Sequence, residues 1–242
     1  MSGFPKSHNR LGYNDSMTTE MPKRGLYRYL KEPVNSLTHF AGIVLSIAAL
    51  VLLLVFSRGE VWRTVSFSIY GTASIVLFTA STLLHSLRVK EEKENYLRIF
   101  DHASIFVLIA GTYTPISLIT LRQSFPAWAW TIFGIAWGIA VLGVAFKLFW
   151  IKAPRFISTG LYLIMGWMAL VAIAPIIKTM PLGGFVWMLI GGLFYSVGAV
   201  VYALKKPDFI PYVFGYHELW HLFVLAGSIS HFVMMYKYVL PV

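Results

Sequence analysis

Residues 215–231 read GYHELWHLFVLAGSISH, and they open the last long apolar segment of the chain. His217 and His221 are four residues apart in this segment. On a helix that spacing places two imidazoles on one face, which is a common way for a helix to offer two nitrogens to one metal ion. The apolar run continues to Tyr238 and is long enough to span a bilayer. The stretch therefore predicts a membrane helix that carries a pair of metal ligands near its beginning.

The composition of the whole chain is that of a membrane protein. Of its 242 residues, 57% are hydrophobic and 12% are charged, whereas a soluble domain carries about a quarter charged residues. The apolar runs are continuous rather than alternating, which indicates helices rather than a barrel, in a multi-pass protein of the cell membrane. Because the chain has no cysteine, any metal must be held by His, Asp or Glu.

Seven apolar runs predict an all-α bundle of seven transmembrane helices. We place the spans at residues 37–56, 64–86, 99–120, 127–148, 157–178, 183–204 and 215–238. Pro115 and Pro175 fall inside spans and are expected to kink them. Gly134 and Gly138 offer a small surface for close helix contact. Residues 1–31 form a polar, basic tail without a cleavable signal sequence, which we predict to be disordered, and residues 32–242 form the membrane domain.

The basic residues predict the orientation of the bundle. Fifteen of the 20 Lys and Arg residues lie on the side of the N-terminus, so the N-terminus is expected in the cytoplasm and the C-terminus outside. In a soluble protein the net charge of +10 would suggest a nucleic-acid partner. Here the basic residues lie between spans, and we expect contact with anionic lipid head groups at the cytoplasmic face and no nucleic-acid partner.

The ionisable residues of the apolar runs gather at one depth. His85 closes the second span, Asp101 opens the third, and His217 and His221 open the seventh. Successive spans alternate in direction, so these four residues share the cytoplasmic side. A titratable group in lipid costs several kcal/mol unless it is paired or bound. We therefore predict a Zn²⁺ site with His85, His217 and His221 as ligands, and with Asp101 either holding the zinc-bound water or joining the ligand shell. If the site is catalytic, Asp101 is the candidate general base.

Several polar residues near this site keep two interpretations. Ser81, one turn before His85, is either a hydrogen-bonding member of the site or a packing serine. Glu32, Asn35 and His39 either cap and solvate the start of the first span or support the metal ligands. His102 and His231 are expected to be structural, the latter as a hydrogen-bonded core histidine. Finally, residues 217–221 spell HELWH, so Glu218 is also a candidate base in an H-E-x-x-H metalloprotease.

Five short motifs in a fixed order resemble the hemolysin III family, the bacterial branch of the progestin and adipoQ receptor family. They are EPVNSLTH at 32–39, STLLH at 81–85, FDHA at 100–103, AGTYTP at 110–115 and HELWH at 217–221. The resemblance covers the whole span region. It implies seven helices with a cytoplasmic N-terminus, zinc on His85, His217 and His221, and Asp101 contacting zinc through water with Ser81 nearby.

The same resemblance also implies what the protein does. The family is similar to alkaline ceramidases, which implies a zinc-dependent hydrolase of lipid amides or esters with a membrane lipid as substrate. Its bacterial members have also been linked to membrane homeostasis and carry a cytolysin label. A non-catalytic sensor or regulator with a structural zinc, a cytolysin, and an intramembrane protease remain as alternatives. The sequence leaves open whether the protein is an enzyme, and also its ligand and oligomeric state.

Overall fold

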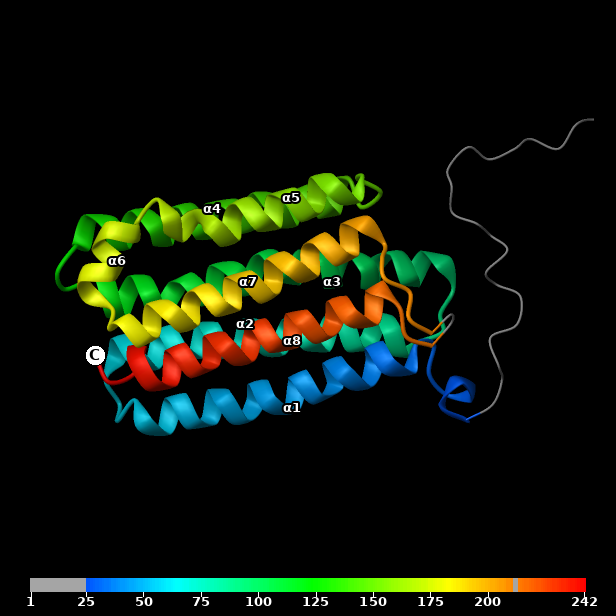
Figure 1. The fold of residues 1–242 in the computed structure, drawn as a ribbon, viewed down its shortest axis with the longest axis horizontal. Coiled ribbons are helices and arrows are strands. Elements are labelled where there is room, and N and C mark those ends of the chain that lie inside the picture. Colours follow the sequence, from blue (N-terminus) through cyan, green and yellow to red (C-terminus); the bar gives the residue numbers. More distant parts are fainter. Residues whose placement is uncertain (1–24, 211–212) are drawn as a thin grey trace, which may run out of the picture.

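The computed structural model describes residues 25–210 and 213–242, and every regular element in this part of the chain is helical (Figure 1). The first 24 residues of the predicted tail lie outside it. The elements are η2 (Gly25–Arg28), α1 (Pro33–Phe56), α2 (Val61–Ser86), α3 (Glu91–Pro115), η3 (Ile116–Leu121), α4 (Pro126–Phe149), α5 (Arg155–Gly166), η4 (Trp167–Leu170), α6 (Ile173–Thr179), α7 (Leu182–Leu204), α8 (Tyr216–Met234) and η5 (Met235–Val239).

Six of the predicted spans are continuous helices long and apolar enough to cross a bilayer. Helices α1 and α4 begin with a proline at their first position, where its missing N–H costs no helical hydrogen bond. Between α1 and α2 the chain reverses through Arg58 and Gly59, both at positive φ. The prediction of an all-α membrane bundle is thus confirmed, and the spans number six or seven depending on how the fifth is counted.

The fifth span is broken. Residues 155–170 and Ile173–Thr179 meet at an angle of 55°. Pro175 has no N–H to offer the carbonyl of Val171, four residues earlier, and the chain turns at that point. Pro115, by contrast, does not interrupt the third span, because residues 91–121 continue as one long helix whose last turns are π-helical. Of the two predicted kinks, only the one near Pro175 becomes a break.

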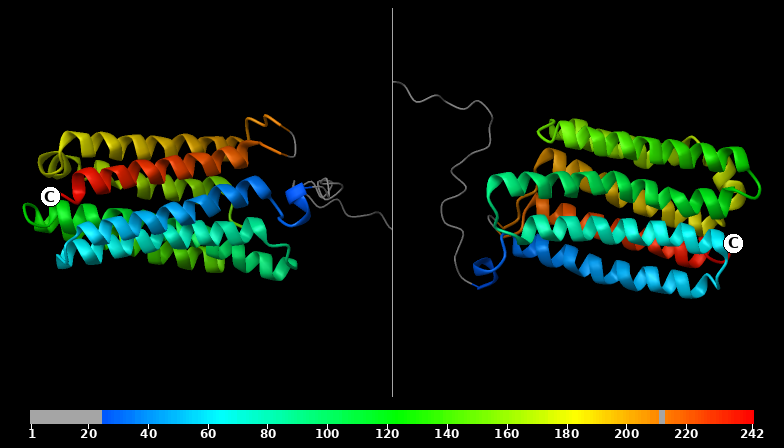
Figure 2. Two further views of the ribbon diagram at one scale, coloured as in Figure 1. Left: turned by 90° about the horizontal axis from the view of Figure 1, so that it is seen from below. Right: turned by 180° about the vertical axis from the view of Figure 1, so that it is seen from behind.

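The helices run side by side along the long axis of the molecule, and α3 lies at the centre (Figures 1 and 2). Helix α1 packs between α2 and α8, α3 packs against α2 and α4, and α7 packs along α8. As a result 83% of the apolar stretch of α3 is buried inside the protein, compared with 22% for α1. The outward faces of α1, α4 and α7 are apolar, as expected of surfaces that contact lipid.

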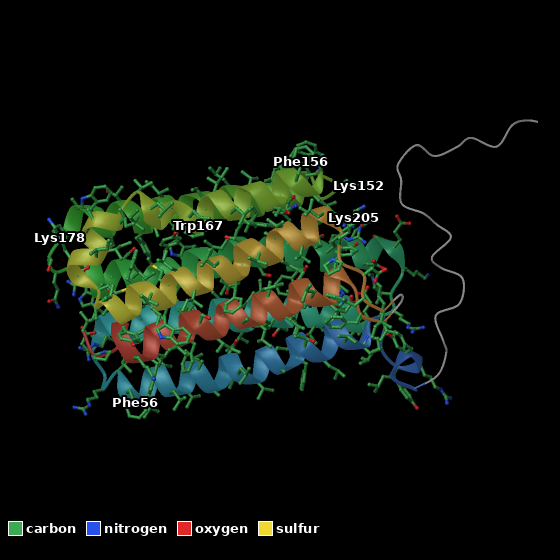
Figure 3. The ribbon with its side chains drawn as sticks, in the orientation of Figure 1. Phe56, Lys152, Phe156, Trp167, Lys178 and Lys205 are labelled. Carbon is green, nitrogen blue, oxygen red and sulfur yellow. The ribbon has the colours of Figure 1, made fainter. Side chains whose placement is uncertain are left out.

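The two ends of the bundle are distinct in their side chains. Lys152, Phe156 and Lys205 lie at the end of the bundle where α1 begins, whereas Phe56 and Lys178 lie at the opposite end (Figure 3). The last turn of α2 and the first turns of α3 and α8 belong to the first of these ends. This is the end to which the alternating spans bring the predicted metal ligands.

Candidate metal centre

Three histidines from two helices converge. His85 comes from the last turn of α2, and His217 and His221 come from the first two turns of α8. One ring nitrogen from each of the three lies within 4.8 Å of the others. The ring centroid of His85 is 5.0 Å from that of His217 and 4.7 Å from that of His221. The prediction that imidazoles from these two helices meet is therefore confirmed, and the cluster is able to hold a metal ion.

Glu32 orients the ring of His85. A carboxylate oxygen of Glu32 lies 2.6 Å from Nδ1 of His85, and the Glu32 side chain does not cap its own helix. The backbone N–H of Glu32 also donates to the carbonyl of His85 at 2.9 Å, so this contact is fixed at two points. With Nδ1 committed to a carboxylate, Nε2 of His85 is left for the centre of the cluster, which is the usual way a protein orients a metal-binding histidine.

The charge of Glu32 is stabilised by its neighbours. Burial on its own would raise the pKa of this carboxyl group. The hydrogen bond with His85, the electrostatic attraction of the neighbouring histidines and a hydrogen bond from Asn35 outweigh burial and hold the pKa at about 2. Glu32 therefore stays an anion across the physiological range and remains an acceptor for His85.

Asn35 connects Glu32 to helix α8. Its side-chain amide donates to Glu32 at 2.8 Å and to Glu218 at 3.0 Å, and Asn35 is only 1% exposed. The other carboxylate oxygen of Glu218 accepts the backbone N–H of Gly215 at 2.9 Å and caps α8. Both oxygens of Glu218 are thus engaged in holding the start of α8 to α1, rather than pointing at the histidine cluster.

His39 is a fourth histidine in contact with the cluster. Its ring stacks on that of His221 with centroids 3.8 Å apart and an angle of 28° between the planes. Phe78 packs edge-on against its other side at 5.1 Å. Neither ring nitrogen of His39 has a hydrogen-bond partner among the described residues. The spacing of Glu32, Asn35 and His39, which places them on one face of a helix, was the sequence signal for this shared role.

Asp101 and Ser81 lie beside the cluster but outside the three-histidine set. Ser81 is 2% exposed, and its hydroxyl is near enough to the Asp101 carboxylate to interact with it. His102 follows Asp101 on α3, and its Nε2 lies 4.0 Å from an Asp101 oxygen. The predicted role of Asp101 as a base that reaches the metal through water remains a prediction.

His231 has a structural environment remote from the cluster. Its Nε2 lies 3.3 Å from the carbonyl oxygen of Met188 on α7, and its ring packs near that of Tyr195. It lies ten residues beyond His221 on the same helix, which is about 15 Å along the axis. This is the hydrogen-bonded core histidine expected from the sequence.

The donor set fits a metal that prefers nitrogen ligands. His85 and His221 are 4% and 2% exposed, and Nδ1 of His221 is buried without a hydrogen-bond partner in the described part of the chain. Leaving such atoms unpaired costs free energy, which binding to a cation removes. Three imidazoles suit zinc and also several other divalent transition metals, so the geometry defines a metal site without fixing which metal.

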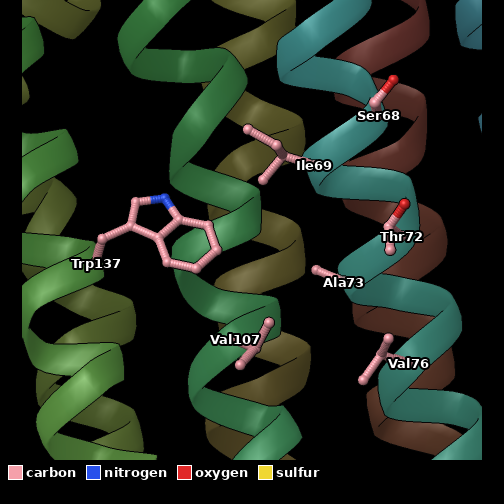
Figure 4. Close-up of a pocket in the computed structure, with 7 residues that line it drawn as sticks. All are labelled: Ser68, Ile69, Thr72, Ala73, Val76, Val107 and Trp137. Carbon is pink, nitrogen blue, oxygen red and sulfur yellow. The ribbon is translucent and has the colours of Figure 1, made fainter.

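An apolar groove of about 340 Å³ lies away from the histidines, between α2, α3 and α4. Trp137 forms one wall, and Ile69, Ala73 and Val107 are among the residues that line it (Figure 4). The indole N–H of Trp137 donates to Thr114 at 3.1 Å, which fixes the plane of that wall. None of the candidate metal ligands lines this groove.

A helical bundle with six or seven spans and a buried histidine cluster at one end defines a multi-pass membrane protein with a candidate metal site. Comparison with known proteins gives the family. The sequence model of the haemolysin-III related family matches residues 27–232, so the chain belongs to that family. This confirms the resemblance seen in the motifs, and it agrees with the placement of the protein in a membrane.

Relatives match over nearly the whole chain. Hemolysin-3 of Bacillus cereus is 41% identical over 230 residues, which is 93% of this chain and 99% of that protein. The Hemolysin-3 homolog of Bacillus subtilis (strain 168) is 40% identical over 219 residues, or 90% and 98% of the two chains. The human monocyte to macrophage differentiation factor is 27% identical over 231 residues, or 92% and 91%.

Proposed function

We propose that this protein is a membrane-embedded zinc hydrolase that cleaves an amide or ester bond of a membrane lipid. The observation that carries the proposal is the cluster of His85, His217 and His221 with the Asp101 carboxylate beside it. Three protein ligands with room for a further one are typical of catalytic rather than structural zinc sites. A zinc ion bound there supplies Lewis acidity toward a carbonyl oxygen and toward water.

The residues of the chain then have separate tasks. Glu32 holds the ring of His85 in place through Nδ1, and the two histidines of α8 complete the ligand set. Asp101 takes the proton of the attacking water as the bond to the carbonyl carbon forms, and returns it to the nitrogen or oxygen that leaves. The Ser81 hydroxyl holds the Asp101 carboxylate in position for both transfers. The acyl chain of the substrate lies among the helices, in surroundings as apolar as the bilayer.

The test is release of fatty acid from a lipid panel by the purified, zinc-loaded protein. The panel contains ceramides, other N-acyl lipids and acyl esters, and free fatty acid is measured by mass spectrometry. His217→Ala is expected to lose both bound zinc and fatty-acid release, whereas His231→Ala, which changes a histidine of the same helix outside the cluster, keeps both. Absence of turnover on every lipid by fully loaded protein would count against the proposal.

A second candidate function is a non-catalytic sensor or regulator with a structural metal. It is favoured by the way the site joins three helices: Asn35 and His39 of α1 contact the α8 residues Glu218 and His221, and Glu32 contacts His85 of α2. A metal there would fasten α2 to α8 directly. A large fall in thermal stability on chelation, together with no turnover by the loaded protein, supports this function over the first.

The H-E-x-x-H protease is the weaker alternative, because both oxygens of Glu218 are already used in capping and in the bond from Asn35. Glu218→Gln separates the two chemistries. It removes the base of a protease-like site and abolishes activity there, but it spares most lipid hydrolysis if Asp101 is the base. A cytolytic role, suggested by the names of the Bacillus relatives, predicts leakage of liposomes that receive the purified protein.

A further inference from the structure

Lys147 is a buried cation that the histidine cluster does not use. It lies in the last turn of α4 and is 1% exposed. Its ammonium group has three N–H donors, yet its one hydrogen bond with the described residues is to the hydroxyl of Ser158, at 2.5 Å. None of the ion pairs within residues 25–210 and 213–242 includes it. Burying a charge without a counter-ion is unfavourable. An anion bound beside Lys147 would therefore offset this cost.

The groups around Lys147 are those that bind anions. Ser158 belongs to the first turn of α5, where the backbone N–H groups carry partial positive charge. Tyr162, one turn after Ser158 on α5, donates its hydroxyl to the backbone carbonyl of His102 on α3 at 3.0 Å, and Nδ1 of His102 is buried without a partner in the described part of the chain. The Asp101 carboxylate faces the other ring nitrogen, Nε2, at 4.0 Å, so Nδ1 stays available. Helices α4 and α5 therefore present donors and positive charge to one place, and α3 packs against α5 one turn away.

The residues around Lys147 indicate that a ligand would reach it from the membrane. Phe149, Trp150 and Phe156 surround the turn between α4 and α5 and are 91%, 49% and 72% exposed, and Phe156 stands at the end of the bundle that carries Lys152 (Figure 3). Exposed aromatic residues beside basic ones are typical of the level at which lipid head groups meet the acyl chains. A molecule that reaches Lys147 from this side arrives from the bilayer, with its apolar part in lipid.

We propose that Lys147, Ser158 and His102 form a binding site for the anionic group of an acyl lipid. The ammonium and the Ser158 hydroxyl contact the ligand oxygens, and Nδ1 of His102 donates to them. The phosphate of a phospholipid and the carboxylate of a fatty acid share the required chemistry, namely negative charge spread over several acceptor oxygens. The site is distinct from the metal centre, and it exists whether or not the protein is a hydrolase.

The experiment compares wild type, Lys147→Met and the control Lys152→Met, in which an exposed lysine of the adjacent turn is removed. The full-length proteins are purified in a neutral detergent and titrated with phosphatidylglycerol, phosphatidylcholine or palmitate. Bound lipid is counted by native mass spectrometry, and the melting temperature is followed. We expect one tightly held anionic lipid and a rise in melting temperature for wild type and Lys152→Met, and a loss of both effects in Lys147→Met.

The three lipids identify the source of the anion. Binding of phosphatidylglycerol assigns the site to a phospholipid, and binding of palmitate alone assigns it to a fatty-acid carboxylate. Ser158→Ala keeps the ammonium and is expected to weaken binding several-fold, which provides a test even if Lys147→Met does not fold. Anionic lipid that binds both variants as tightly as wild type, or that stabilises wild type no more than phosphatidylcholine does, overturns the proposal.

One further readout addresses the opposite charge state of Lys147. A neutral amine hydrogen-bonded to Ser158 would act as a base for that hydroxyl instead of binding an anion. Such a pair makes Ser158 react with a fluorophosphonate probe, in a manner that Lys147→Met abolishes. Labelling of that kind overturns the anion site, whereas an unreactive Ser158 supports it.

Discussion

The hydrogen bond between Glu32 and His85 joins the start of α1 to the candidate metal centre. Glu32→Gln keeps an acceptor for Nδ1 but removes the negative charge, and Glu32→Ala removes both. We expect metal affinity to fall by about 10-fold for Gln and by up to about 100-fold for Ala, the range found when such supporting groups are lost. Competition with a chelator of known affinity measures the change.

The control for this prediction is Glu94→Gln. Glu94 is also a carboxylate at this end of the bundle, but it pairs with Lys31 and Arg98 away from the histidines. Its replacement should leave metal affinity unchanged. Equal losses in Glu32→Gln and Glu94→Gln would mean that the general negative potential of this end matters, and not the contact with His85.

Asn35 is expected to be sensitive to an added charge. Asn35→Asp has nearly the same shape, but it replaces two N–H donors by a third carboxylate between Glu32 and Glu218. Because the position is buried, we expect the free energy of unfolding to fall by about 1–3 kcal/mol or more at neutral pH. Thr38→Ala, which removes a hydroxyl bonded only to its own helix, serves as the control. Similar melting temperatures for the two variants would contradict the role of Asn35 as a bridge.

The sequence was sufficient to predict that the three histidines meet and insufficient for the residues that contact them. His217 and His221 share a face by their spacing, and the alternation of spans brings His85 to the same depth, so their meeting needed little beyond periodicity. The rotation of α1 about its own axis cannot be predicted in this way, because it depends on how α1 packs against its neighbours. Gly42 of α1 lies directly against the ring of Phe78, and that contact turns His39 and Glu32 inward. No local pattern fixes such an angle, so both residues kept two interpretations.

At the scale of helices, Gly111 permits the close crossing of α2 and α3. A Cβ atom at this position would lie 2.7 Å from Cβ of Ala73, and both atoms are attached to rigid helical backbone. Gly111→Ala is therefore expected to push the two helices apart and to lower the melting temperature by several degrees, at a cost of about 1–3 kcal/mol. Since α2 carries His85, weaker metal binding should accompany the change.

Gly138→Ala is the matched control for Gly111→Ala. Both glycines lie within long membrane helices, but a Cβ atom at Gly138 meets nothing within 4 Å in the described structure. The intrinsic preference of helices for alanine then makes this variant neutral or slightly more stable. A loss of stability at Gly138 equal to that at Gly111 would show that the crossing of α2 and α3 is not what matters.

The glycines also show which features of the elements could be predicted. The spacing of Gly134 and Gly138 suggested a contact surface, but both face open space in the described structure. The spacing of small residues marks a surface that permits close approach and does not say which neighbour approaches it. Most spans were predictable to within a few residues, because length and hydropathy define them. The third is the exception, because its helix begins at Glu91, well before the predicted start at residue 99. The sequence predicted only a kink at Pro175, whereas the structure has a break in the fifth span. The break lies near the carbonyl of Val171, to which Pro175 cannot donate a hydrogen bond.

At the scale of the whole molecule, the orientation in the membrane decides which leaflet the metal centre faces. The structure separates the two ends of the bundle, with Lys152 at the end of the histidine cluster and Lys178 at the other (Figure 3). The excess of basic residues at the first end predicts that it is cytoplasmic. The centre would then draw its substrate or ligand from the inner leaflet, where anionic lipids and the basic residues of this end attract one another.

The absence of cysteine from the chain makes this orientation directly measurable. Lys152→Cys and Lys178→Cys each introduce a single thiol at an exposed position, the first in the turn before α5 and the second in the last turn of α6. In intact cells a membrane-impermeant maleimide is expected to label Lys178→Cys and to leave Lys152→Cys unlabelled until the membrane is permeabilised. The opposite pattern would place the histidine cluster at the outer leaflet, and the proposed inner-leaflet substrate would have to be abandoned while the cluster itself remained intact.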